Sequence, residues 1–92
     1  MSPIRAGHQA AVGVLTEASA HLRTVDPSMP GRVLLSDAGW VALRRTEDKT
    51  GLRLSTVSAG TLAGLLDEIA QGDHVPGPAL SLAADITREA AS

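Results

Sequence analysis

Apolar residues in the first 25 positions recur at steps of three and four, which predicts one long helix. Ser2 and Pro3 suit the N-cap and the first helical position. The helix should end before Asp26-Pro27, because the residue that precedes a proline avoids the helical region. The apolar seam is rich in small alanines, which permit close packing either on a sheet or on a twin helix. We therefore expect it to mediate homodimerisation through Leu15, Ala18 and Leu22.

The period changes to two in the middle of the chain, which is typical of strands with one covered face. We expect three antiparallel strands over residues 32–36, 40–46 and 52–57. A turn at residues 37–39, with Gly39 at a positive φ, should join the first two strands. A charged loop over residues 47–51 should join the last two. The side chains predicted to point inward are Val41, Leu43, Leu52 and Leu54.

The next segment carries the clearest helical pattern in the chain, with Leu62, Leu65, Leu66 and Ile69 spaced by three and four. Ser58 is its predicted N-cap and Gly72 its C-cap. A weaker helix is expected over residues 79–91. The fold class predicted is α+β in a single domain, residues 1–92. It consists of an N-terminal helix, a three-stranded antiparallel meander, and one or two C-terminal helices on one sheet face.

Composition narrows the functional classes. The 92 residues include no Cys, Phe or Tyr, and Trp40 is the single aromatic residue. The absence of cysteine excludes disulfides, thiolate zinc sites and cysteine nucleophiles. With no secretory signal and no apolar run of about 20 residues, we expect a cytoplasmic protein without a membrane span. A small aliphatic core favours stabilisation by a homo-oligomer or a partner.

The sequence predicts no catalytic residue, no metal site and no cofactor. His8 lies on the apolar seam, His21 is expected to face solvent, and His74 stands beside Asp73 in a loop. No serine sits in a nucleophile elbow and no glycine run forms a phosphate cradle. The remaining acidic pairs are interpreted as solvated helix faces: Asp67 with Glu68, and Asp85 with Glu89.

The outward face of the predicted sheet is the candidate binding surface. It would carry Trp40, Arg44 and Arg53, and Trp and Arg are the side chains most enriched at interface anchors. We expect these three residues to bind a protein partner. The sequence leaves open whether Trp40 lies on that surface or folds over the sheet edge into the core.

Two alternatives remain. A nucleic-acid-binding regulator would use the basic residues Arg32, Arg44, Arg45 and Arg53, although the net charge of −2 and the acidic C-terminal helices disfavour phosphate. A peptide-recognition domain would add an extended ligand to the edge of the sheet.

Residues 32–73 also resemble a known family. The run Val-Ala-Leu-Arg-Arg-Thr-Glu-Asp-Lys-Thr-Gly at residues 41–51, Leu54, and a helix that ends near Gln71-Gly72-Asp73 resemble a small actinobacterial, BldB-associated family of unknown function. Arg45 stands where that family usually has Asp. Members accompany Xre-type helix-turn-helix regulators. The resemblance implies a non-enzymatic interaction module whose partner is a transcription regulator.

Overall fold

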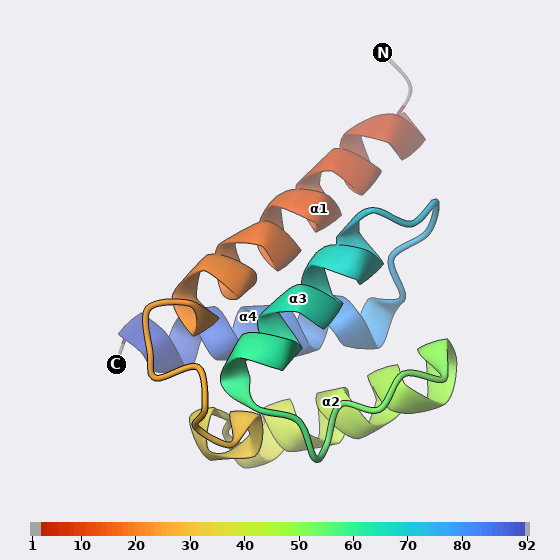
Figure 1. The fold of residues 1–92 in the computed structure, drawn as a ribbon. Helices are drawn as coiled ribbons and strands as arrows, with labels where there is room; N and C mark the ends of the chain where they lie inside the picture. The colour runs from red at the N-terminus through yellow and green to blue at the C-terminus, as the bar shows by residue number, and fades with distance from the viewer. Residues whose placement is uncertain (1–2, 92) are drawn as a thin grey trace.

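The protein is built from helices (Figure 1). The computed structural model describes residues 3–91, with side chains from residue 7, so the predicted N-cap Ser2 lies outside it. The elements are α1 (Pro3–Leu22), the 3-10 helix η1 (Gly31–Leu34), α2 (Asp37–Thr50), α3 (Ala59–Ala70) and α4 (Gly77–Ala91). α1 packs against α3 and α4, and α2 packs against α4. α4 is thus the element that connects the two sides of the domain.

The predicted α+β class is wrong. Residues 32–34 lie in η1, and Leu35 and Ser36 are extended but pair with no strand. Residues 40–46 lie inside α2, and residues 52–57 are irregular. Within residues 3–91 no strand forms, and strand-like pairing is limited to one isolated antiparallel bridge between Pro30 and Ser58. The turn expected at residues 37–39 is the first turn of α2.

α2 forms because both of its ends are capped and one of its faces is buried. The Ser36 hydroxyl accepts a hydrogen bond from the Gly39 amide, and Asp37 places a negative charge in the first turn. Gly51 ends the helix in the left-handed conformation with φ 74°, which glycine adopts without strain. The buried face recurs at steps of three and four, through Gly39, Ala42, Leu43 and Thr46.

This helical register reverses two predicted orientations. Val41 was expected to point inward, but its side chain is 49% exposed. Ala42, which the strand pattern places outward, is buried. Thr46 is β-branched and fully buried, yet its hydroxyl donates to the Ala42 carbonyl at 2.8 Å and so satisfies its hydrogen bond within the helix.

The other three helices are confirmed, with shifted ends. α1 ends at Leu22, before the predicted limit at residue 25, and α4 begins at Gly77. The Ser58 hydroxyl caps α3 by accepting from the Thr61 amide. The predicted C-cap Gly72 does not have that role, because α3 ends at Ala70 with Gln71 as its cap in the right-handed conformation.

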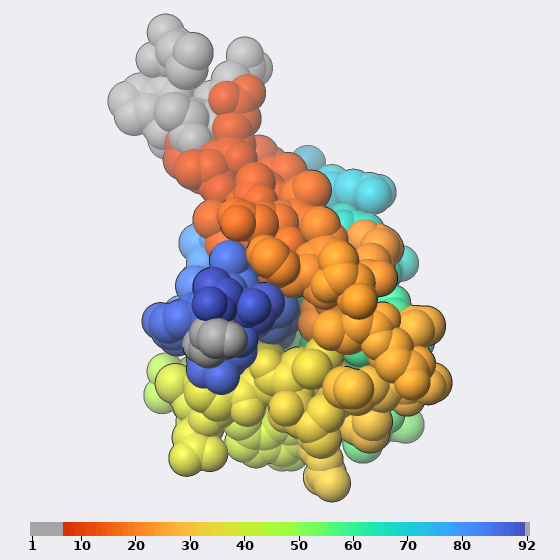
Figure 2. Space-filling model, turned by 90° about the vertical axis from the view of Figure 1, so that its left-hand side faces the viewer, coloured from red at the N-terminus to blue at the C-terminus, as the bar shows by residue number. Residues whose placement is uncertain are grey.

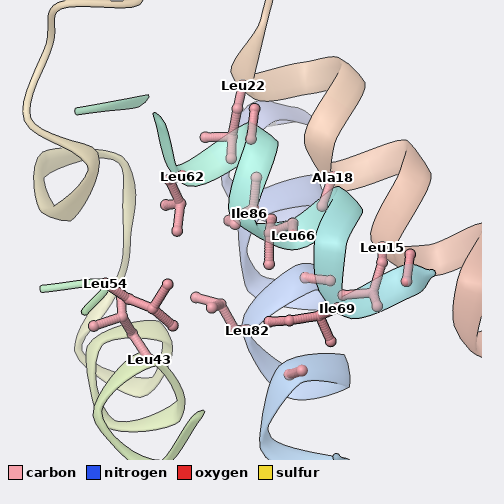
Figure 3. Close-up of a cluster of buried hydrophobic side chains, with 14 of the residues drawn as sticks. Leu15, Ala18, Leu22, Leu43, Leu54, Leu62, Leu66, Ile69, Leu82 and Ile86 are labelled. Atoms are coloured by element: carbon pink, nitrogen blue, oxygen red, sulfur yellow. The ribbon is translucent and has the colours of Figure 1, made fainter. Parts of the chain in front are cut away.

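The core is a cluster of leucines and alanines where α1, α3 and α4 meet, and it continues to α2 through Leu43 and Leu82 (Figure 3). Leu54, from the irregular segment before α3, is also buried and lies close to Leu43. Burial of one leucine side chain stabilises the fold by about 1.5–3 kcal/mol. With so few large side chains, the domain relies on close helix packing through small residues.

Polar side chains fix the helices relative to one another. The buried hydroxyl of Ser19 on α1 donates to the Ala63 carbonyl of α3 at 3.1 Å. Arg23 donates to Ser19 and also forms an ion pair of 2.6 Å with Asp67 of α3. No buried side-chain nitrogen or oxygen lacks a hydrogen-bond partner in the part of the chain that the structure describes.

One further contact fixes the start of α2 on α4. Asp85 of α4 is 1% exposed, and its carboxylate accepts from both the hydroxyl and the amide of Ser36. Arg88 donates to the same carboxylate at 3.2 Å. Gly39 lies directly against Asp85, so that a Cβ at position 39 would overlap the carboxylate. We call these three residues, Ser36, Gly39 and Asp85, the α2–α4 clasp.

The clasp leads to a stability prediction. Gly39→Ala should lower the free energy of unfolding by about 2–3 kcal/mol, because the added methyl group displaces the Asp85 carboxylate from Ser36. Gly64→Ala in α3 is the control: its Cβ would meet no atom within 4 Å, and alanine favours helix by up to about 1 kcal/mol. Urea titration should give shifts of opposite sign. Equal stability of Gly39→Ala and the unsubstituted protein would contradict the clasp.

Candidate interaction surface

α2 places Trp40 and Arg44 one helical turn apart, so the two side chains meet. The guanidinium carbon of Arg44 lies 5.9 Å from the centroid of the Trp40 ring, within the range of a cation–π contact. Trp40 is half-buried and packs against the edge of the core, while Arg44 is exposed. The sequence left open whether Trp40 lies on the surface or in the core. In the structure its indole packs against the core and is also partly exposed to solvent.

A carboxylate at the end of α2 brings Arg53 to the same side. One Glu47 oxygen accepts from the backbone amides of Leu54 and Ser55, at 2.7 and 2.8 Å. The other lies 3.5 Å from Nε of Arg44. The segment after Gly51 consequently runs back along α2 (Figure 1), where Arg44 and Arg53 line one hollow. Arg44 thus adjoins Trp40 on one side and Arg53 on the other, although the predicted sheet is absent.

Two residues of η1 extend this surface on the other side of Trp40. Arg32 and Val33 line a second hollow together with Trp40. Val33 is 61% exposed, the highest value for a large hydrophobic residue in the described chain. We call the five residues Arg32, Val33, Trp40, Arg44 and Arg53 the η1–α2 surface.

Val33 also lines a separate apolar pocket of about 230 Å³, where the end of α1, η1 and the end of α4 meet. Figure 2 shows the face on which these three segments come together. Its aliphatic walls include Val25, Leu34 and Ile86, and His21 and Glu89 add polar groups. We call it the α1–η1–α4 pocket. Sequence reasoning missed it because its walls come from segments with no shared periodicity.

The seam predicted for self-association lies inside a single chain. Leu15, Ala18 and Leu22 are at most 1% exposed and belong to the core between α1 and its neighbours α3 and α4. The pattern was that of a helix packing face, as expected, but the chain's own helices cover it. In this structure the three residues are not accessible to a second copy.

Asp85 was interpreted as part of a solvated face with Glu89, and this is wrong: Asp85 is buried in the clasp, whereas Glu89 is exposed. Burial by itself raises the pKa of Asp85. Hydrogen bonds from the hydroxyl and amide of Ser36, and from Arg88, outweigh this effect and hold the pKa below its usual value. The Ser36 hydroxyl is in turn engaged with Asp85 and the Gly39 amide, which is the geometry of a helix cap.

The histidines do not assemble with other ligands into a metal site. His8 of α1 and His74 of the loop before α4 line one hollow with Asp73, and His21 lies 4.0 Å from Glu17 one turn earlier. Across the described residues, no group of three or more histidines and carboxylates has the geometry to hold a metal ion.

Arg45, the remaining basic residue of the nucleic-acid alternative, is exposed on α2.

Comparison with known proteins gives no family assignment: no family model, no curated protein and no solved structure matches this chain. Among the described helices, none combines the length and apolar character that crossing a bilayer requires.

Glu47 should control the order of the segment that carries Arg53. Glu47→Ala should reduce the free energy of unfolding by about 1–2 kcal/mol, because two backbone amides lose a charged acceptor. It should also speed amide hydrogen exchange at Leu54 and Ser55. Asp48→Ala, at the adjacent exposed position, is the control and should change neither quantity. Unchanged exchange in Glu47→Ala would show that the carboxylate does not hold the segment.

Asp85 should make the free energy of unfolding depend on pH. Because its folded-state pKa is depressed, its stabilising contribution is complete above the unfolded-state pKa of about 3.9. That contribution is lost as the pH falls through this value toward the folded-state pKa. Urea midpoints at pH 7 and pH 3.5 should therefore differ less in Asp85→Asn than in the unsubstituted protein. Glu89→Gln, exposed one turn later, should keep the full difference, and an equal difference in Asp85→Asn would refute the assignment.

Proposed function

We propose that this chain is a small, non-enzymatic interaction module that binds and modulates another protein through the η1–α2 surface. The observation that carries the proposal is the setting of Trp40. The only aromatic side chain is held partly buried on a capped helix, with Arg44 over its ring and Val33 exposed in the hollow that Trp40 lines. Tryptophan and arginine are the side chains most enriched at the anchors of protein interfaces.

The partner class rests on the family resemblance over residues 32–73, which suggests a transcription regulator. The predicted homodimer remains a proposal of its own. Because Leu15, Ala18 and Leu22 are covered within one chain, a dimer would have to use another surface. The η1–α2 surface would then serve self-association as well as partner binding.

Nucleic-acid binding is the second candidate function. It is favoured because basic residues are concentrated in one part of the chain. Residues 31–57 contain five of the eight basic residues but only three of the ten acidic ones. Phosphate binding would make the affinity fall steeply with salt concentration. Addition of a peptide to a sheet edge is not proposed, because the described residues contain no sheet.

The proposal predicts that Val33→Asp abolishes partner binding without affecting the fold. A charge at this exposed position should prevent burial of Val33 and Trp40 against a partner. Ala10→Asp, on an exposed face of α1 near its start, carries the same charge change and is the control. Tagged forms of all three proteins serve as baits in the native lysate.

Proteins retained by the unsubstituted bait and by Ala10→Asp, but lost with Val33→Asp, support the proposal. Titration of the purified partner should then shift the emission of Trp40, which is the only tryptophan signal from this chain. Partners that Val33→Asp retains equally well, with no change in Trp40 emission, would refute the η1–α2 surface as the binding site.

A further inference from the structure

Val33 separates two hollows of different chemistry. On one side it lines the α1–η1–α4 pocket, and on the other it lines the hollow with Arg32 and Trp40. Leu35 lines both hollows as well, so they adjoin along η1. A segment that lies across Val33 can therefore reach an apolar pocket and, at the same time, a hollow that holds Arg32, Asp37 and Trp40.

The pocket is large enough to receive one bulky apolar side chain. Its volume of about 230 Å³ exceeds the cavity of about 150 Å³ that is known to bind benzene in a protein interior. Its walls include the aliphatic side chains Val25, Leu34 and Ile86. An aliphatic or aromatic anchor that enters it would bury surface that this chain leaves open.

The segment next to the pocket, residues 31–57, is net positive, although Asp37 shares the hollow of Arg32 and Glu89 lines the pocket itself. Arg32, Arg45 and Arg53 form no ion pair with any described residue. Glu47, the acidic residue closest to Arg44, has one oxygen directed at the backbone amides of Leu54 and Ser55. Residues 31–57 carry a net charge of +2 from five basic and three acidic side chains, whereas the rest of the chain carries −4. An acidic ligand would therefore be attracted to this side of the molecule.

We infer that the occupant of the η1–α2 surface is a short acidic segment of a partner protein with one bulky apolar anchor. The anchor enters the α1–η1–α4 pocket, and carboxylates of the segment meet Arg32 in the adjoining hollow and Arg53 in the hollow beyond Arg44. This inference rests on the proposed function and specifies its ligand. It assigns the anchoring contact to the pocket and the choice of partner to the arginines.

The test is selection of a displayed library of random 16-residue peptides against the full chain. Enriched peptides should have a net negative charge and share one Phe, Leu or Trp, and Trp-free members should shift the emission of Trp40. Their affinity should fall at least about tenfold with Val33→Asp, with Ala90→Phe and with Arg32→Glu, as expected for loss of a contact of about 1.4 kcal/mol. Ala90 is an exposed residue of the pocket wall, so phenylalanine there should fill the pocket without disturbing the core. Ala10→Asp should leave the affinity unchanged.

Several outcomes would overturn the inference, and they separate it from the proposed function. Neutral or basic peptides that still depend on Val33 would refute the acidic ligand but keep the interaction surface. Peptides that bind Val33→Asp equally well and leave Trp40 emission unchanged would refute both. Absence of enrichment would refute a short segment as the ligand, and the bait experiment would then decide the proposed function.

Two further controls identify rival occupants. A molar mass that rises with protein concentration, and no longer does so in Val33→Asp, would assign the surface to a second copy of this chain. Binding of a labelled 20-base-pair DNA duplex that weakens steeply between 50 and 200 mM salt would assign the arginines to phosphate instead. Either result would replace the acidic segment as the ligand.

Discussion

The position of α2, and with it the whole η1–α2 surface, depends on one buried carboxylate. Asp85 accepts two hydrogen bonds from Ser36, which is also the residue that caps α2. The Ser36 carbonyl accepts from the Trp40 amide at 2.9 Å and so starts the helical hydrogen-bond ladder. The contact that docks α2 on α4 therefore also sets the register of α2. From that register follow the direction of Trp40 and the placement of Arg44 over its ring.

The clasp constrains how α2 packs as well as stabilising the fold. Removing a carboxylate from water carries a desolvation cost that its hydrogen bonds must offset, so a buried charge is weak evidence of net stabilisation. A core made of leucine and alanine, however, tolerates many alternative packings. Asp85 with Ser36, Ser19 with the Ala63 carbonyl, and Glu47 with two loop amides each demand one arrangement. In this small domain, polar contacts select one packing among several that the aliphatic residues alone would permit.

The sequence predicted the helices whose buried faces contain at least two large aliphatic residues at helical spacing. α3 has Leu62, Leu66 and Ile69 at helical spacing, and its face was identified directly. α2 was missed because its buried face contains a single large residue, Leu43, among glycine, alanine and threonine. Small residues contribute little to a hydrophobic pattern, so the accidental alternation of Val41 and Leu43 outweighed the helical period. The capping residue Ser36 and the acidic Asp37 were the available signals for a helix start.

Asp85 illustrates a second limit of the sequence. It lies between Leu82 and Ile86 on the buried face of α4, but beside Arg88 and Glu89 it resembles a solvated charge. The distinction depends on Ser36, 49 residues earlier, which supplies two donors. A pattern within one helix cannot reveal a hydrogen-bond partner in another. The α1–η1–α4 pocket was invisible for the same reason, since three separate segments form it.

Trp40 and Arg44 share one face of α2, as they would share one face of the predicted strand, for a geometric reason. Residues four apart lie on the same face of a strand, where the period is two, and also on the same face of a helix, where it is 3.6. Residues two apart share a face in a strand but lie on opposite sides of a helix, so Val41 does not share the buried face of Leu43. Adjacent residues lie on opposite faces of a strand but only 100° apart on a helix, so Ala42 is buried beside Leu43. A binding surface inferred from residues at a spacing of four is therefore robust to confusion between helix and strand. The predicted orientation of the side chains between such residues does depend on the secondary structure, and these side chains decide what else a ligand touches.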